Sequence, residues 1–333
     1  MDDQEFVESA LRDWSTAIEM VSWTAMPKVT NPIWQVAATD GRSYVLKLLP
    51  EYPPGAGPVD EFRVLCHLQK RGIPVALPVV TDEGRIHTTV DGRLVALLPM
   101  LPSSADDHEF GADPTGTAFD VGRAIGVLDE VLNEVPWTIK SFSDDDPAGS
   151  LDGLAALPDE VRLQVEPWGD RLRHAVRDLP TQLTHGDCNT GNVLIDRGRV
   201  SGFLDFDHLP SGPRVRDLVS YLVSRLRHQL VRQNGEAGDI RAWGGAFPSY
   251  LAGYHDACSL TAQEINAVVP LMLLVEVGGA HWCLHGWEPN PEGYQMNRLS
   301  IAWLVEHFEE LSREAQAAIQ DRVTPTTCQG KPR

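Results

Sequence analysis

The stretch of sequence that determines the fold is residues 184–208, which read THGDCNTGNVLIDRGRVSGFLDFDH. Asp187 precedes Asn192 by five positions, and an apolar run then leads into a polar turn around Asp196. A second apolar run follows this turn and ends directly before Asp205. Two apolar runs joined by a short polar turn predict a β-hairpin. We therefore expect the hairpin to bring Asp205 back beside Asn192.

The polar residues around this hairpin fit the transfer of a phosphoryl group. Such a transfer needs a carboxylate beside the attacking hydroxyl group and oxygen ligands that hold Mg²⁺ on the nucleotide phosphates. Because Mg²⁺ prefers a few hard oxygen ligands, we expect Asn192 and Asp205 to hold the metal and Asp187 to accept the substrate proton. In the alternative interpretation, these Asp and Asn residues only form turns with their own backbone. That alternative leaves Asp205, directly after an apolar strand, unexplained.

A resemblance to a known family follows from these residues. The segments 185–187 and 205–207, His-Gly-Asp and Asp-Phe-Asp, together with Asn192, resemble the catalytic and metal-binding loops of the aminoglycoside phosphotransferase family. This family includes homoserine, choline and methylthioribose kinases and is similar to protein kinases. The resemblance implies an α+β, bilobal, protein-kinase-like fold, with an antiparallel sheet in a small N-terminal lobe and a larger, mostly helical C-terminal lobe. It also implies ATP as the co-substrate and Mg²⁺ as the cofactor.

The length of the chain and its breaks fit two lobes. A chain of 333 residues is long enough for more than one hydrophobic core. We place an N-terminal nucleotide-binding lobe at 1–101, a catalytic and acceptor-binding lobe at 102–323, and a disordered polar tail at 324–333. A segment rich in Ser, Asp, Pro and Gly at 102–116 marks the connection between the lobes.

The N-terminal lobe is predicted to contain two helices and several strands. Apolar residues at helical spacing predict the first helix at 4–21. Strand-like runs around an Asp-Gly turn predict strands at 33–38 and 43–49. A second helix is expected near 59–71, and an apolar strand at 94–101 follows another Asp-Gly turn.

Four residues of this lobe are candidate nucleotide contacts. A lysine inside an apolar strand is costly unless it is paired, and the resemblance makes Lys47 the residue that holds the phosphates, with Glu61 as its ion-pair partner. A solvent-facing lysine and a surface glutamate are the ordinary interpretations. The resemblance also places the adenine ring after the last strand, with Met100 as its contact. Asn31 would serve the phosphate-covering loop, although such loops are usually rich in glycine and 26–32 contains two prolines and no glycine.

The acceptor site is expected in the helical lobe. The segment 276–288 combines aromatic and acidic residues, and a tryptophan face can hold a cation that a carboxylate neutralises. The candidate acceptor contacts are Asp207, Trp282, Trp287 and Glu288, although core packing explains the tryptophans equally well. Together with the net charge of −19, they favour an amine-bearing alcohol such as an aminoglycoside or an amino alcohol.

Three other functions are open on the sequence alone. A homoserine-kinase-like enzyme for a hydroxy amino acid would need an arginine for the acceptor carboxylate, and Arg214 and Arg216 are candidates. A non-catalytic nucleotide-binding protein would explain the unusual phosphate loop, but it has no evident need for Asp187, Asn192 and Asp205 together. A protein kinase is least favoured, because the short segment after Asp205 leaves little room for a long activation segment.

Composition argues against other classes of protein. Acidic residues outnumber basic ones by 47 to 28, which argues against nucleic acid and anionic membranes as partners. Five scattered cysteines without a paired metal spacing are typical of reduced thiols. We find no signal-peptide pattern, and the longest apolar run, 267–275, is too short to span a bilayer. We therefore expect a cytoplasmic protein, and the sequence gives no indication of its oligomeric state.

Overall fold

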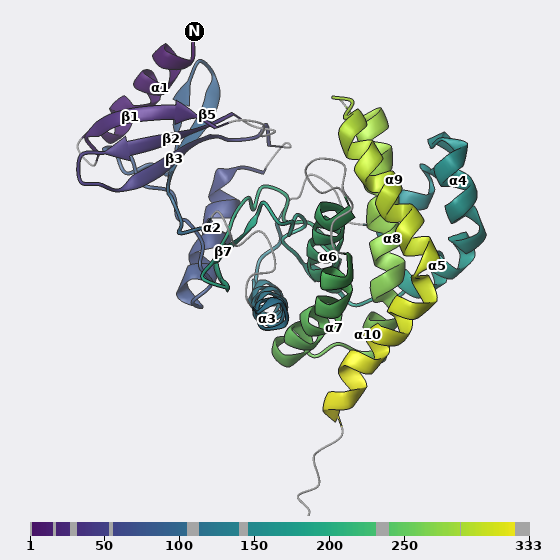
Figure 1. The fold of residues 1–333 in the computed structure, drawn as a ribbon. Helices are drawn as coiled ribbons and strands as arrows, with labels where there is room; N and C mark the ends of the chain where they lie inside the picture. The colour runs from purple at the N-terminus through teal and green to yellow at the C-terminus, as the bar shows by residue number, and fades with distance from the viewer. Residues whose placement is uncertain are drawn as a thin grey trace, which may run out of the picture.

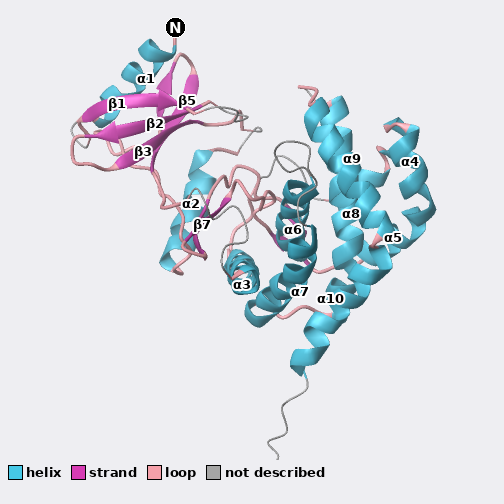
Figure 2. Cartoon of the chain, viewed as in Figure 1, coloured by secondary structure: helices cyan, strands magenta, loops and turns pink. Residues whose placement is uncertain are grey.

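The five-stranded sheet and most of the helices occupy different parts of the molecule (Figures 1 and 2). A five-stranded sheet forms the N-terminal end, and a larger, mostly helical part lies beside it. The predicted α+β arrangement of a small sheet-containing part and a larger helical part is confirmed. The computed structural model describes residues 2–15, 18–26, 32–52, 56–104, 113–139, 146–230, 240–286 and 288–323.

The N-terminal sheet is antiparallel, with the strand order β1-β2-β3-β5-β4. Its strands are β1 (Met20–Ala25), β2 (Ile33–Ala38), β3 (Ser43–Leu48), β4 (Thr88–Val90) and β5 (Arg93–Pro99). The predicted strands at 33–38, 43–49 and 94–101 are therefore confirmed as β2, β3 and β5. Asp91 and Gly92 join β4 to β5 with φ values of 50° and 75°, the left-handed pair that a tight hairpin turn requires.

The helix predicted at 4–21 is wrong in its second half. The helix α1 spans Asp3–Leu11, a 3₁₀ turn continues to Trp14, and the chain then enters β1. Trp14 is fully buried, and its indole donates a hydrogen bond to the Val79 carbonyl at 2.8 Å. Pairing of β1 along β2 supplies backbone hydrogen bonds that a longer helix would forgo. Tertiary docking therefore overrides the helical periodicity of this segment.

The larger part of the molecule is built mainly from helices. They are α2 (Pro58–Lys70), α3 (Pro114–Asn133), α4 (Asp159–Val165), α5 (Gly169–Val176), α6 (Val215–Leu230), α7 (Ile240–Ala257), α8 (Ala262–His285), α9 (Pro291–Glu306) and α10 (Phe308–Val323). A capping box begins α8: the Thr261 hydroxyl accepts from the Glu264 N–H, and the Glu264 carboxylate accepts from the Thr261 N–H. The helices α9 and α10 meet at His307.

Two hydrophobic cores hold these parts together. The smaller core joins α1 to the sheet. The larger core includes the helical part and also Val64, Leu65 and Leu68 of α2. The helix α2 therefore packs with the helical part, although it lies early in the chain. The division of the chain at residue 101 remains a prediction.

The helices α3 and α7 pack closely because each contributes a glycine to the contact. A Cβ atom on Gly122 would lie 2.0 Å from the Tyr250 carbonyl oxygen, and one on Gly253 would lie 2.0 Å from the Phe119 carbonyl oxygen. No side chain fits at either position, so this pair of helices is held in one register.

Among the residues that the structure describes, α8 alone is long and apolar enough to cross a membrane by length and composition. Within its most apolar window, 61% of the residues are buried inside the protein. Its neighbours are α5, α6, α9 and α10, so α8 has the packing of a core helix.

The hairpin predicted around Asp196 is confirmed. The strand β7 (Val193–Asp196) pairs antiparallel with β8 (Arg199–Phe203). Arg197 and Gly198 form the turn with φ values of 52° and 75°. Two further short strands pair antiparallel with each other: β6 (Thr181–Leu183), which precedes the hairpin in the chain, and β9 (Ser211–Pro213), which follows it. The segment 184–192, which we call the HGD loop, therefore lies between two anchored strands.

Candidate active site

The HGD loop is held by a buried aspartate on α6. The two oxygens of Asp217 accept hydrogen bonds from the backbone N–H groups of His185 at 2.7 Å and Gly186 at 2.9 Å. Asp217 and His185 are both fully buried. Hydrogen bonds to an ionised, buried acceptor are among the stronger ones in proteins. The start of α6 therefore fixes the backbone directly before Asp187.

His185 connects this loop to the segment that carries Asp205. Its Nε2 atom lies 2.8 Å from the Leu204 carbonyl oxygen, which can only accept, so Nε2 carries the proton. Its Nδ1 atom accepts a hydrogen bond from the Asp187 N–H at 3.2 Å. Donation from one nitrogen and acceptance at the other define a neutral imidazole. His185 therefore links both loops through its ring.

Asp187 and Asn192 are in direct contact. The Asn192 side-chain amide donates to both the carbonyl oxygen and the carboxylate of Asp187, each at 2.9 Å. Asn189 donates to the other carboxylate oxygen at 2.9 Å. Because the Asn192 nitrogen serves Asp187, the Asn192 amide oxygen is the atom that a cation would use. A neutral amide oxygen is a suitable ligand for a hard cation.

Asp205 lies at the return of the hairpin, as predicted. The Leu204 N–H donates to the Asn192 carbonyl oxygen at 2.8 Å, which sets the two segments side by side. Asp205 has a φ value of 64°, a left-handed conformation that is costly for a non-glycine residue and is concentrated at functional sites. Its side chain remains 41% exposed. A partly exposed carboxylate beside the Asn192 amide fits a divalent metal ion.

Lys47, on β3, contacts two aspartates of the segment that follows β8. Its ammonium group donates to Asp205 at 2.8 Å and to Asp207 at 2.7 Å. Burial alone would lower the pKa of Lys47, but the charges of Asp207, Asp205 and Glu61 outweigh it and raise this pKa above its usual value. Lys47 is therefore a buried, charged lysine, as the sequence requires of a lysine inside an apolar strand.

Glu61 lies near Lys47 but has a different hydrogen-bond partner from the one expected. Its carboxylate accepts a hydrogen bond from the Tyr52 hydroxyl at 2.9 Å, whereas the ammonium group of Lys47 is shared by Asp205 and Asp207. Lys47 and Glu61 do line one narrow cavity together. The expected pairing is therefore corrected to an electrostatic interaction at longer range, because two nearer carboxylates take the direct contacts.

The aspartates of the site differ in their affinity for protons. Burial raises the pKa of Asp187, and hydrogen bonding by Asn189 partly offsets this effect. For Asp205, the attraction of Lys47 outweighs burial and lowers the pKa. For Asp207, burial raises the pKa to about 7 despite the attraction of Lys47. Of this set, Asp205 is the carboxylate held most firmly in the ionised form.

Other predicted nucleotide contacts are less directly supported. Met100 follows β5 and is 43% exposed. Its backbone N–H donates to the Ser43 carbonyl oxygen at 3.0 Å, so a nucleotide base would meet its carbonyl group or side chain. Asn31 lies outside the described residues.

The candidate acceptor residues near the end of α8 are exposed rather than buried in the core. Trp282 is 58% exposed, and Glu288 is exposed beyond the helix. Near this end of α8, the His285 ring lies 3.3 Å from the Ala156 carbonyl oxygen. Trp287 lies outside the described residues. A role for these residues in acceptor binding remains a prediction.

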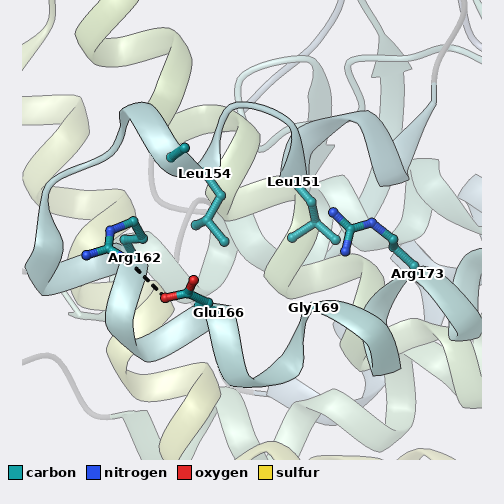
Figure 3. A pocket seen from close by; sticks show the side chains of 7 residues that line it. Leu151, Leu154, Arg162, Glu166, Gly169 and Arg173 are labelled. Atoms are coloured by element: carbon teal, nitrogen blue, oxygen red, sulfur yellow. Dashed lines mark hydrogen bonds and ion pairs between the residues drawn. The ribbon is translucent and has the colours of Figure 1, made fainter.

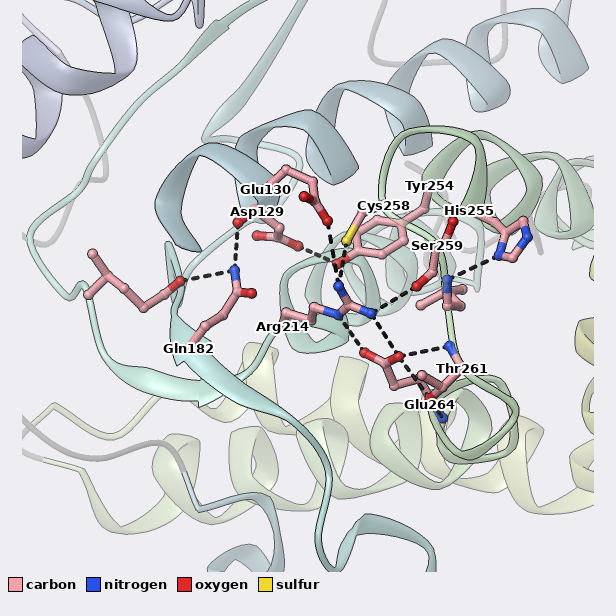
Figure 4. A network of polar contacts seen from close by, with 12 residues as sticks. Asp129, Glu130, Gln182, Arg214, Tyr254, His255, Cys258, Ser259, Thr261 and Glu264 are labelled. Carbon is pink, nitrogen blue, oxygen red and sulfur yellow. Dashed lines mark hydrogen bonds and ion pairs between the residues drawn. The ribbon is translucent and has the colours of Figure 1, made fainter. Parts of the chain in front are cut away.

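Arg214 is engaged in the protein interior (Figure 4). Its guanidinium forms a two-pronged ion pair with Glu264 at 2.6 and 3.0 Å and donates to the Ser259 carbonyl oxygen at 2.8 Å. The Glu264 side chain is 1% exposed. Arg214 therefore joins the start of α6 to the start of α8, and the hypothesis that it binds an acceptor carboxylate is corrected. Arg216, the other candidate, has interactions of its own within the protein.

A separate cavity of about 500 Å³ lies in the helical part (Figure 3). Leu151 and Leu154 form its apolar wall, and Arg162 is paired there with Glu166 at 3.0 Å. All its lining residues belong to the segment 151–173. This cavity is therefore distinct from the HGD loop and from the cavity that contains Lys47.

Sequence reasoning missed the residues that support the site. Asp217 gives only a weak signal, because a carboxylate in the first turn of a helix is a common feature. Its role follows from its full burial and its two backbone contacts, neither of which is visible in the sequence. The same is true of His185, whose ring links the two loops.

The sequence of this chain is similar to those of known phosphotransferases and kinases. Residues 24–256 match the phosphotransferase enzyme family. The serine/threonine protein kinase RdoA of Salmonella typhimurium is 25% identical over 281 residues, which cover 79% of this chain and 77% of that protein. A homoserine kinase of Neisseria meningitidis is 27% identical over 209 residues, covering 60% of this chain and 62% of that protein.

Solved structures show the same fold. The amicoumacin kinase hAmiN, solved with AMP-PNP and Ca²⁺, has a TM-score of 0.65 at 16% identity. The matched region covers 93% of this chain and 94% of the hAmiN chain. A microcompartment-associated aminopropanol kinase has a TM-score of 0.65 at 17% identity, and the matched region covers 93% of this chain and 99% of the aminopropanol kinase chain.

The fold and the site together define a protein-kinase-like phosphotransferase. The chain belongs to the phosphotransferase enzyme family, whose match covers more than half of its length, and the predicted resemblance to aminoglycoside phosphotransferases is confirmed. As a member of this family, the protein is a phosphotransferase enzyme.

Proposed function

We propose that this protein transfers the γ-phosphoryl group of ATP to a hydroxyl group of a small, amine-bearing molecule, with Mg²⁺ as the metal. The observation that carries the proposal is the joined set of Lys47, Asp187, Asn192 and Asp205. Their contacts connect a phosphate-binding cation, a base and two oxygen ligands through a few hydrogen bonds. This is the set of groups that phosphoryl transfer requires.

Each residue has a separate role in this reaction. Lys47 binds the nucleotide phosphates, and Asn192 and Asp205 would hold Mg²⁺ through oxygen atoms. The bound metal would neutralise charge on the phosphates. Asp187 orients the acceptor hydroxyl and accepts its proton, and its raised pKa, caused by burial, makes it a better base than a free aspartate.

An amine on the acceptor is supported by charge. The protein has a net charge of −19, so its long-range field attracts cations. Arg214, which a carboxylate-bearing acceptor could have used, is paired with Glu264. We retain Asp207, Trp282, Trp287 and Glu288 as candidate acceptor contacts. The aminopropanol kinase and the amicoumacin kinase have the same fold, and they suggest the first compounds to test.

The homoserine kinase relative supports a second candidate, a hydroxy amino acid as acceptor. Homoserine differs from an amino alcohol by its carboxylate, so the two acceptors can be compared directly. Because the RdoA relative is named a serine/threonine protein kinase, a generic protein substrate belongs in the same panel.

The test is a coupled assay of ADP release with MgATP and a panel of matched acceptors. The panel contains 1-amino-2-propanol, its amine-free analogue 1,2-propanediol, homoserine and an aminoglycoside. We expect turnover with an amine-bearing alcohol, none with 1,2-propanediol, and loss of turnover in Asp187→Asn with nucleotide binding retained. Turnover with 1,2-propanediol alone would refute the preference for an amine.

The assay also separates the proposal from a non-catalytic nucleotide-binding protein. That alternative predicts MgATP binding by calorimetry and no turnover with any acceptor or protein. Equal turnover in the wild type and in Asp187→Asn would contradict the assigned base. We further propose that the protein acts in the cytoplasm, where ATP is abundant and thiols such as the buried Cys188 and Cys258 remain reduced.

A further inference from the structure

A buried carboxyl group on α3 lies behind the anchor of the HGD loop. Asp129 is fully buried near the end of α3 and accepts a hydrogen bond from the Tyr254 hydroxyl at 2.6 Å through Oδ2 (Figure 4). Its other oxygen, Oδ1, is buried without a donor among the described residues. The Asp217 carboxylate lies near enough for its charge to act on Asp129. Two carboxyl groups therefore meet inside the protein, one of which holds the HGD loop.

Two carboxyl groups can form a hydrogen bond only if one of them carries a proton. Asp217 accepts backbone N–H groups with both of its oxygens, so both oxygens act as acceptors here. Asp129 receives one donor, and its second oxygen has none. Burial and the charge of Asp217 both favour protonated Asp129. The proton therefore belongs on Oδ1 of Asp129.

We propose that Asp129 is a protonated positioning residue, whose Oδ1 hydroxyl donates to the Asp217 carboxylate and so fixes the HGD loop beside the catalytic Asp187. The positioning role rests on the proposed function, whereas the protonation of Asp129 does not. In this arrangement Asp217 is bound on one side by the backbone of the HGD loop and on the other by α3. Because α3 is locked to α7 by the glycine contacts, this support is rigid.

Other groups around Asp129 do not remove the need for this proton. Arg214 attracts the ionised form, but its guanidinium is shared with Glu264 at 2.6 Å, so it neutralises another carboxylate first. The Gln182 amide donates at 2.6 Å to the Asp129 backbone carbonyl and not to its side chain. The remaining titratable neighbours are uncharged or anionic: Tyr254, Cys188, Cys258 and Asp217.

The substitution Asp129→Asn tests the proposal because an amide preserves the donor to Asp217 and cannot ionise. We expect it to keep the wild-type fold and turnover. Asp129→Ala removes the donor, so we expect a loss of turnover of about tenfold or more, which corresponds to about 1.4 kcal/mol, with nearly unchanged KM for ATP. Glu130→Gln, at the next position of α3 and half-exposed, is the matched control and should behave as the wild type.

Two readouts do not depend on activity. At neutral pH, the infrared spectrum of the wild type minus that of Asp129→Asn should contain a protonated-carboxyl band, and the wild type minus Glu130→Gln should contain none. Asp207, whose pKa is about 7, contributes to every spectrum and cancels in these differences. Hydrogen exchange should rise in peptides covering 184–190 for Asp129→Ala and stay unchanged for Asp129→Asn. A general loss of packing would instead raise exchange throughout α3 and α7.

The outcomes separate this inference from the proposed function. The absence of a protonated-carboxyl band from the wild type minus Asp129→Asn difference would show that Asp129 is ionised and would overturn the proposal. Equal exchange at 184–190 in Asp129→Ala and the wild type would overturn the positioning role. If no acceptor is phosphorylated by the wild type, the proposed function fails, while the infrared and exchange results still decide the state of Asp129. If Asp129→Ala does not fold, Asp129→Asn alone carries the infrared test.

Discussion

Replacing Arg214 by methionine tests whether this residue serves stability or the acceptor. Arg214 forms a two-pronged ion pair with Glu264, and the two side chains are 17% and 1% exposed. The variant leaves Glu264 buried without its cation, which costs about 3–5 kcal/mol at such sites. Glu264 keeps hydrogen bonds from the Thr261 N–H and hydroxyl groups. We therefore expect the lower end of this range, about 3 kcal/mol.

The assay is urea unfolding followed by circular dichroism. With a slope of about 3 kcal/mol per M, a loss of about 3 kcal/mol lowers the unfolding midpoint by about 1 M. Arg123→Met is the matched control, because Arg123 pairs with Asp256 at 3.2 Å and both side chains are about half exposed. An exposed pair of this kind contributes at most about 1 kcal/mol. The double variant Arg214→Met/Glu264→Gln should recover part of the loss, because it no longer buries an unpaired charge.

The pH dependence gives an independent check. Burial would raise the pKa of Glu264, but Arg214 and Thr261 outweigh it and lower the pKa below 4.5 in the folded protein. A lowered pKa contributes stability above the unfolded value, and this contribution is lost as the pH falls through the folded value. The difference between the wild type and Arg214→Met should therefore shrink below about pH 4.5. If Arg214→Met is as stable as Arg123→Met but has a raised KM for the acceptor, our assignment of Arg214 is refuted.

Three further predictions address the site and the helical packing. Asp205→Ala should abolish metal-dependent MgATP binding in calorimetry, whereas retained binding would contradict its role as a metal ligand. Gly122→Ala should lower the free energy of unfolding by about 3 kcal/mol, since its Cβ would meet a backbone carbonyl. Gly244→Ala, whose Cβ meets open space, should raise the free energy of unfolding by up to about 1 kcal/mol. Equal unfolding midpoints for the two variants would contradict this reasoning. Thr261→Ala should lose about 1 kcal/mol in the same unfolding assay through the missing cap, and no change would argue against the capping box.

Much of the fold was predictable because its signals are local. Asp-Gly and Arg-Gly turns carry the left-handed residues that hairpins require, so β2, β3, β5 and the β7–β8 hairpin follow from short stretches. The failure at 4–21 has a physical cause, since the segment after Trp14 pairs with a strand that lies elsewhere in the chain. Local periodicity contains no information about such a partner.

The sequence by itself determined the candidate site, because the spacing of Asp187, Asn192 and Asp205 around a hairpin brings the segments that carry them together. Only the tertiary structure determined which partner each charge has. In the folded protein, Lys47 forms ion pairs with Asp205 and Asp207. The Glu61 carboxylate accepts a hydrogen bond from Tyr52, and Arg214 is ion-paired with the buried Glu264. When two charged residues lie far apart in the sequence, packing and desolvation determine whether they pair in the interior. Both depend on the whole fold rather than on neighbouring residues.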